Sequence, residues 1–310
     1  MASKNEGHSA GQARPGRSLF AQMVESRIRS SLGDIPGGLD AYELPLGDPG
    51  LFGPDSMAWK VHGDLPSMLI GGFCALMIQM LHPLAMAGVH AHSRFREDPL
   101  GRLQRTGRFI AGTTYGSMPL VGQLVEEVHA VHARVQGTAP NGRRYSAADP
   151  ELLRFVHVSE LWSFLAAYQR YSLHPLLRHE KDQYFVEMAV VGELLGATDV
   201  PVSLDEARSY LRDIEPELCK SEQTDEAMAF LGRPVTSALA DVAAHRLILA
   251  AATDLMPPRL QRLLGLEPAP WGSGSMVRTA ASAFSLCARW ALGPSPVVTR
   301  ARHRATADVA

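Results

Sequence analysis

The chain of 310 residues carries 30 basic and 32 acidic side chains, for a formal charge of −2, and 46% of its residues are hydrophobic. This composition allows a large buried core and excludes a protein drawn to nucleic acid by its overall charge. Three widely spaced cysteines form neither a disulfide framework nor a CxxC metal site, which favours a reducing compartment.

Both ends of the chain differ in composition from its middle. Residues 1–19 are small and polar, without the apolar run of a secretory signal, and predict a disordered tail. Residues 20–64 are rich in glycine, proline and aspartate around one short helical pattern, SLFAQMVESRIRSSL, and predict an irregular wrapping arm. Residues 294–310 contain the basic run RARHR and predict a flexible tail.

The middle of the chain is helical almost throughout. Its apolar residues predict helices over 66–91, 99–116, 119–136, 150–172, 179–195, 204–214, 222–231, 235–253, 257–264 and 275–292. We find no strand-like alternation, no heptads and no internal repeat. The predicted fold class is therefore all-α, with a single multi-helix domain over residues 65–293.

The most apolar stretch is LPSMLIGGFCALMIQML, residues 65–81. It is at the short limit for a membrane span and contains Gln79 and two glycines, so a buried core helix is the favoured interpretation. Without a signal segment we expect a cytoplasmic protein, and this helix leaves peripheral membrane attachment open.

The helix predicted over 119–136 places its two histidines on different faces. His132 shares a face with Val121, Val125 and Val128 at steps of three and four, so it points toward the core. His129 falls on the polar face and is expected to be solvated. In the next long helix, which Asp149 is predicted to cap, His157 also lies on the inward stripe.

The sequence lacks several known catalytic motifs, which excludes the enzyme classes that depend on them. A ferritin-like di-iron centre needs two Glu-x-x-His pairs, and only EEVH, ending at His129, qualifies. The run HEKDQ at His179 lacks the second histidine of HExxH, and no GxSxG, P-loop or GxGxxG occurs. What remains is a helical protein with inward histidines, each a hydrogen-bonded core residue or a haem ligand, and the pattern does not decide between them.

The run LHPLAMAGVHAHSRFREDPLGRLQRTGRF, followed by HARVQGTAPNGRRYSAADPELLRFVH and YFVEMAVVGELLG, resembles the MpaB-like oxygenases. That family includes the catalytic domain of latex-clearing protein, a rubber oxygenase. The resemblance runs from about Phe52 to Leu266. It implies a helical domain whose globin-like core holds one b-type haem and whose members cleave isoprenoid double bonds with dioxygen. Position by position, the proximal histidine falls on His132.

The resemblance also implies residues beside the haem. Latex-clearing proteins have an Arg-x-x-Lys-Thr series there, and RLQRT presents Arg102, Arg105 and Thr106, which would polarise bound oxygen or hold the haem propionates. The alternative for the two arginines is ordinary helix-surface charge. His157 matches a family position in the pocket wall, where it would bond a propionate; otherwise it is a core histidine satisfied by Ser159 or a backbone carbonyl.

One departure from the family concerns the catalytic base. Latex-clearing proteins have a glutamate upstream of the arginine series, but no acidic residue occurs here between Asp64 and Glu97. This argues against polyisoprene cleavage by that route. His82, His90 and His92 occupy the region, and His82 is the candidate distal base or second axial ligand. The alternative is helix-end hydrogen bonding by His82 and solvent exposure of His90 and His92.

The leading hypothesis is a haem-b oxygenase that acts with dioxygen on a hydrophobic small molecule, with an isoprenoid-like chain as one candidate substrate. An electron donor is an expected but unidentified partner. Two other classes stay open. The same haem would serve a peroxidase-type or dehydrogenating oxidation of a phenolic or indolic compound, and a haem carrier or sensor would have no catalytic activity.

Overall fold

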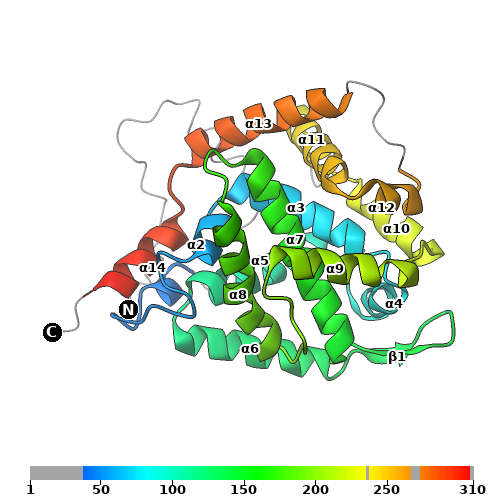
Figure 1. The fold of residues 1–310 in the computed structure, drawn as a ribbon, viewed down its shortest axis with the longest axis horizontal. Coiled ribbons are helices and arrows are strands. Elements are labelled where there is room, and N and C mark those ends of the chain that lie inside the picture. The colour runs from blue at the N-terminus through cyan, green and yellow to red at the C-terminus, as the bar shows by residue number, and fades with distance from the viewer. Residues whose placement is uncertain (1–37, 235–236, 267–272, 308–310) are drawn as a thin grey trace, which may run out of the picture.

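The computed structural model describes residues 38–234, 237–266 and 273–307. This part of the chain forms thirteen α-helices, two short 3₁₀ turns and one two-stranded hairpin (Figure 1). In chain order these are η1 Asp40–Tyr42, α2 Met57–His62, α3 Leu65–Gln79, α4 Pro83–His92, α5 Pro99–Tyr115, α6 Met118–His132, β1 Gln136–Thr138, β2 Arg144–Ser146, α7 Pro150–Tyr171, α8 Arg178–Leu194, α9 Leu204–Asp213, η2 Glu215–Glu217, α10 Glu222–Leu231, α11 Leu239–Leu255, α12 Pro258–Leu263, α13 Ser273–Leu292 and α14 Pro296–Thr306.

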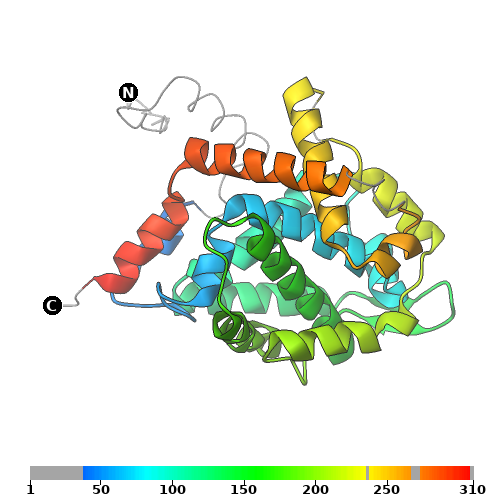
Figure 2. The same cartoon turned by 45° about the horizontal axis from the view of Figure 1, so that its top comes forward.

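Helix α7, the longest helix described, lies at the centre with α3 beside it (Figures 1 and 2). The two backbones approach closely at Gly71, where a Cβ atom would lie 2.9 Å from Cα of Phe164. One apolar cluster joins α3 and α7 to α11, α12 and α13, and another joins α7 to α2, α8 and α9. Because α7 belongs to both clusters, it joins the two into one helical core.

The apolar stretch 65–81 is a core helix. Ile70, Cys74 and Met77 on α3 have no exposed surface and pack in the cluster shared with α7 and α11. Among the described residues, no single helix is long and apolar enough to cross a membrane. The pair α3 and α4 reaches that length only in combination, and it bends by 104° at the break.

That bend corrects the predicted continuous helix over 66–91. Helix α3 ends at Gln79, and α4 starts at Pro83 with His82 as its N-terminal cap. Proline has no backbone N–H to donate into a preceding turn, so the chain restarts a helix there instead of continuing one. The helical spacing of apolar residues in the sequence continues across this break, because both helices are apolar, so it gave no sign of the break.

The small hairpin corrects a purely helical prediction. Strands β1 and β2 pair antiparallel, with Gly137 opposite Tyr145. A Cβ atom at Gly137 would lie 2.6 Å from the Tyr145 hydroxyl, so a larger residue there would displace the Tyr145 side chain. Three-residue strands are too short to show alternation in a sequence, and the helix predicted to reach 136 ends at His132.

The predicted irregular arm, residues 20–64, already packs against the helical domain before residue 65. Helix α2 lies within the predicted arm, yet Ala58 and Val61 are fully buried, and the backbone N–H of Ala58 donates to Glu187 of α8 at 2.8 Å. Residues 38–56 are irregular apart from η1, as predicted. The predicted tail 1–19 and the helical pattern at residues 18–32 lie outside the described residues.

The prediction of a flexible tail over residues 294–310 is wrong for the residues that the structure describes, because they form α14. Arg304 has no exposed surface; its Nε donates to the Asp48 carbonyl at 2.9 Å and its Nη1 to the Tyr42 carbonyl at 3.2 Å. The basic run therefore anchors the C-terminal helix onto η1 and the loop after it. The carbonyl groups that accept hydrogen bonds from Arg304 lie more than two hundred residues earlier in the sequence. The sequence alone therefore suggested that this basic run was exposed to solvent.

Candidate functional site

Helices α5 and α6 form an antiparallel hairpin that turns at Gly116. Arg108 of α5 pairs with Glu127 of α6 at 2.6 Å, and Gly112 packs so tightly on Leu124 that no Cβ fits. Arg102 lies near the start of α5 and His132 is the last residue of α6, so these two predicted site residues lie toward the same, open end of the hairpin on different helices.

His132 is the last residue of α6 and is half-buried. Its Nδ1 atom is buried and has no hydrogen-bond partner within the described part of the chain. Burial, and then the neighbouring His129, lower the pKa of His132, so its ring is neutral at pH 7. The prediction of a solvated His129 is confirmed.

The lack of a partner sets His132 apart from the other histidines. Each other described histidine that is not exposed makes a ring hydrogen bond: His62, His82, His90, His157 and His245. A buried polar atom without a partner costs about 1–3 kcal/mol. His132 therefore has a ring atom that the rest of the described protein leaves unsatisfied.

The three residues of the RLQRT series have different environments. Arg102 is half-buried, burial lowers its pKa, and its guanidinium makes no hydrogen bond or ion pair with another described residue. Arg105 is exposed and pairs with Asp98 at 3.2 Å, which is the helix-surface alternative. Thr106 is exposed on the same helix, and its role stays a prediction.

His157 is buried between α7 and α8. Its Nε2 donates to the Met188 carbonyl at 2.9 Å, and burial lowers its pKa to about 4. A Cβ at Gly192 would lie 2.8 Å from the ring, so glycine makes room for it. This geometry is that of the core-histidine alternative.

His82 caps the start of α4. Its Nδ1 accepts a long hydrogen bond of 3.4 Å from the Ala85 backbone, its ring lies 4.8 Å from that of Phe155, and burial lowers its pKa. This is the helix-end alternative. His92 is exposed, as that alternative expects, and its Nε2 lies 3.2 Å from the Tyr145 hydroxyl.

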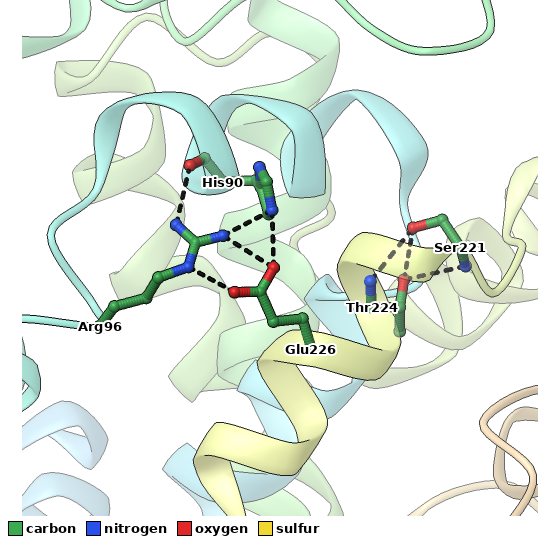
Figure 3. Close-up of polar contacts among 5 residues, drawn as sticks. All are labelled: His90, Arg96, Ser221, Thr224 and Glu226. Carbon is green, nitrogen blue, oxygen red and sulfur yellow. Dashed lines mark hydrogen bonds and ion pairs between the residues drawn. The ribbon is translucent and has the colours of Figure 1, made fainter.

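His90 is held in an ion-pair cluster rather than exposed to solvent (Figure 3). Its Nε2 lies 2.9 Å from Glu226 of α10, and Arg96 contacts both residues. Hydrogen bonds from Arg96 and His90 lower the pKa of Glu226 to about 2. Beside it, Ser221 and Thr224 cap α10 (Figure 3). The cluster fastens α10 to α4.

Sequence reasoning missed a second group of buried polar residues. His62 of α2 bonds Thr114 of α5 at 2.7 Å and Tyr184 of α8 at 2.9 Å. The Thr114 hydroxyl donates to the Ile110 carbonyl, so it accepts from His62 Nδ1, and Nε2 accepts from Tyr184. Burial lowers the pKa of His62 to about 3. We call His62, Thr114, Tyr184 and His157 the interior histidine cluster.

Glu160 is a further titratable residue that no motif indicated. It follows His157 by one helical turn on α7, and its charge acts on Tyr184. Burial raises the pKa of Glu160 to about 7, so this carboxyl keeps its proton to a higher pH than an exposed glutamate does.

A surface hollow between α8 and α9 contains none of the predicted site residues. It is lined by Arg178, Lys181, Asp182, Leu204, Asp205 and Arg208. Its charges partly compensate each other, with Arg178 and Arg208 each 3.5 Å from Asp205. We assign no function to this hollow.

No group of three or more histidine, cysteine, aspartate or glutamate side chains in the described ranges is arranged to hold a metal ion. A haem iron, in contrast, takes a single histidine from a globin-like protein. The donor set at the open end of the α5–α6 hairpin, one neutral imidazole and one unpaired guanidinium, fits an iron ligand and a partner for a propionate.

Much of the motif that carries the family resemblance serves the fold. Asp98 and Asp149 cap α5 and α7, and each is followed by a proline in the first turn. Gly137 and Tyr145 meet across the hairpin. These residues place α5, α6 and α7 relative to one another, whereas His132 and Arg102 have no such structural task.

These observations define a mostly helical protein with an unsatisfied histidine at the end of a helix hairpin. The family model for ER-bound oxygenase mpaB/B'/Rubber oxygenase, catalytic domain, matches residues 59–291, so the chain belongs to this family of oxygenases. The match starts within α2 and ends in α13, and membership implies an oxidoreductase. Searches of curated proteins and of solved structures gave no match.

Proposed function

We propose that the protein is a haem-b oxygenase that acts with dioxygen on a hydrophobic small molecule, with His132 as the iron ligand. The unsatisfied His132 ring carries this proposal, because a neutral imidazole without a protein partner is available to bind a metal. The bound haem would supply the oxygen-activating chemistry, which no amino-acid side chain provides.

Arg102 would hold the haem through a propionate. Its guanidinium is half-buried and has no carboxylate partner among the described residues, so a propionate would compensate its charge. Arg105 already pairs with Asp98 and is assigned no contact with haem. Thr106 remains the candidate hydroxyl donor on the same helix.

The other histidines would act around the site rather than on the iron. His157 has its Nε2 committed to Met188, so we assign it a packing role. His82 remains the candidate distal base, since its bond to the Ala85 backbone is long and a neutral ring accepts a proton.

The test is the visible spectrum and pyridine haemochrome of the full chain, expressed with a haem precursor, beside His132→Ala and His129→Ala variants. The parent and His129→Ala are expected to hold b-type haem, and His132→Ala to hold at least about tenfold less, because it loses the ligand. His129 is the matched control because it is exposed and lies one turn earlier on α6. A parent without haem, or a fully loaded His132→Ala, would refute the proposal.

Labelled dioxygen then separates the reaction classes. Incorporation of its oxygen into a hydrophobic alkene supports an oxygenase, whereas turnover that requires peroxide and incorporates no oxygen supports the peroxidase-type alternative. A haem protein inert toward both would be a carrier or sensor.

A further inference from the structure

Glu160 of α7 is an interior carboxyl that keeps some accessible surface and has no protein partner. It is half-buried, whereas His157, Ser163 and Phe164, each about one turn away on the same helix, are at most 6% exposed. Its carboxyl makes no hydrogen bond or ion pair within the part of the chain that the structure describes. A carboxyl in such surroundings is stabilised by keeping its proton, so it presents an O–H donor.

The other polar side chains around Glu160 have partners of their own. Tyr184, on which the charge of Glu160 acts, donates to His62, and His62 donates to Thr114. His157 donates to a backbone carbonyl of α8. These groups hold one another in place, whereas the Glu160 carboxyl is held by none of them. It is therefore available to a bound molecule.

Glu160 lies between two points at which α7 is tied to the α5–α6 hairpin. Near the start of α7, the Ala147 backbone N–H donates to the Val135 carbonyl just after α6, at 2.8 Å (Figure 1). One turn beyond Glu160, the Phe164 ring packs edge-on against His62, with 5.5 Å between the ring centroids, and His62 is bonded to α5. Glu160 therefore belongs to the stretch of α7 that runs beside the hairpin.

Along this stretch the hairpin and α7 are joined by side chains rather than by close backbones. The backbones of α5 and α6 approach α7 at few points, whereas α3 lies closely against it. Phe109 and Ile110 of α5 pack in the apolar cluster shared by α2, α7 and α8. His132 and Arg102 lie toward the open end of the same hairpin. Glu160 is thus a polar residue in apolar surroundings, on the helix beside the one that carries the proposed iron ligand.

We propose that Glu160 contacts the substrate, and that its protonated carboxyl donates a hydrogen bond to an uncharged oxygen atom of an otherwise apolar molecule, such as a ketone. This inference rests on the proposed function for the place of the substrate. Apolar surroundings with one available donor match an apolar molecule with one acceptor. A pure hydrocarbon would leave the carboxyl without a partner, and a charged amine would bury an ion pair.

Three aromatic probes of similar size separate these substrate classes. Acetophenone offers a carbonyl oxygen, ethylbenzene has no polar atom, and 1-phenylethylamine carries a positive charge at neutral pH. Their dissociation constants for the purified full chain are measured by ligand-observed NMR at pH 6. Acetophenone is expected to bind about tenfold more tightly than ethylbenzene, because it alone accepts the buried hydrogen bond.

Substitutions at Glu160 distinguish a substrate contact from a structural role. Glu160→Leu should remove the preference for acetophenone and leave ethylbenzene binding unchanged, whereas Glu160→Gln keeps an N–H donor and should retain the preference. At pH 9 the parent should lose most of the preference, because the carboxyl has then released its proton, and Glu160→Gln should not. Glu193→Leu makes the same chemical change at an exposed position of α8 and should behave as the parent.

The titratable groups around the Glu160 carboxyl do not account for this pH dependence. Burial lowers the pKa of His62 and His157 to about 3 and about 4, so both rings are neutral from pH 6 to pH 9. Burial raises the pKa of Cys74 on α3 to about 12 and that of Tyr184 well above 10. Glu187 of α8 accepts a hydrogen bond from the backbone of α2.

Two results would overturn the inference. One is a parent that binds acetophenone no more tightly than ethylbenzene, or a Glu160→Leu variant that keeps the preference. The other is tightest binding of 1-phenylethylamine, lost in both Glu160 variants, which would identify a cationic substrate. The haem content of the same samples tests the proposed function separately. A preference that depends on Glu160 in a protein that takes up no haem would keep the contact and remove the oxygenase, and haem-loaded protein without the preference would do the reverse.

Discussion

The interior histidine cluster and the open end of the α5–α6 hairpin contain similar groups in opposite states. In the cluster, His62 has a side-chain partner on each ring nitrogen and His157 a backbone partner. At the hairpin end, His132 and Arg102 have none among the described residues. Burial lowers the pKa of His62, His132 and His157 alike. The hydrogen bonds, rather than the pKa, separate the histidines that hold the fold from the one proposed to bind a ligand.

The largest effect is expected from His62→Ala. The substitution removes a buried ring, leaves the Tyr184 hydroxyl without its partner and takes one hydrogen bond from Thr114, so it should lower the free energy of unfolding by about 3 kcal/mol or more. Urea unfolding followed by circular dichroism measures it, with His129→Ala as an exposed control expected to change little. A loss of under about 1 kcal/mol would show that the cluster does not support the fold.

The contrast between these regions also explains what the sequence could predict. Helix α7 follows its predicted range closely, with Asp149 as its cap, because periodicity and capping are local signals. The inward direction of His132 came from helix spacing, and the family resemblance chose it as the ligand. Both required only residues close together in the chain.

The interior histidine cluster had no local signal. Thr114 and Tyr184 lie 52 and 122 residues from His62, which stands in a short helix within a glycine- and proline-rich arm. The buried Arg304 was missed for the same reason. A polar residue that is satisfied across the fold looks in sequence like one exposed to solvent, so such positions required the structure.

A second prediction uses pH to sharpen the comparison. Burial raises the pKa of Glu160 to about 7 from 4.5, and lowers those of His62 and His157 from 6.5 to about 3 and about 4. Between pH 4.5 and 6.5 the native state therefore keeps a proton on Glu160 that the unfolded chain releases. It also lacks protons that the unfolded chain binds on the two histidines. Acidification is stabilising through Glu160 and destabilising through the histidines.

Glu160→Gln removes the stabilising part of this balance. The free energy of unfolding of the variant should fall with acidification more steeply than that of the parent, by about 1.4 kcal/mol per pH unit. Urea titrations across the same pH range measure the two slopes. The exposed Glu193 gives the matched control, since Glu193→Gln should keep the parent slope. Parallel slopes for Glu160→Gln and the parent would mean that Glu160 is ionised in the native state.

The smallest expected effect on the fold is at His132. Leucine at this position removes a polar ring that has no protein partner and supplies an apolar side chain to a half-buried site. In protein prepared without haem, His132→Leu should therefore leave the free energy of unfolding unchanged or raise it by up to about 1 kcal/mol. The same substitution at His62 should lower it, because there two hydrogen-bond partners lose their bonds. The same substitution is thus expected to change the free energy of unfolding in opposite directions at a histidine that binds a ligand and at a histidine that supports the fold. If His132→Leu were as destabilising as His62→Leu in urea unfolding, His132 would be part of the fold, and the distinction between the two regions would fail.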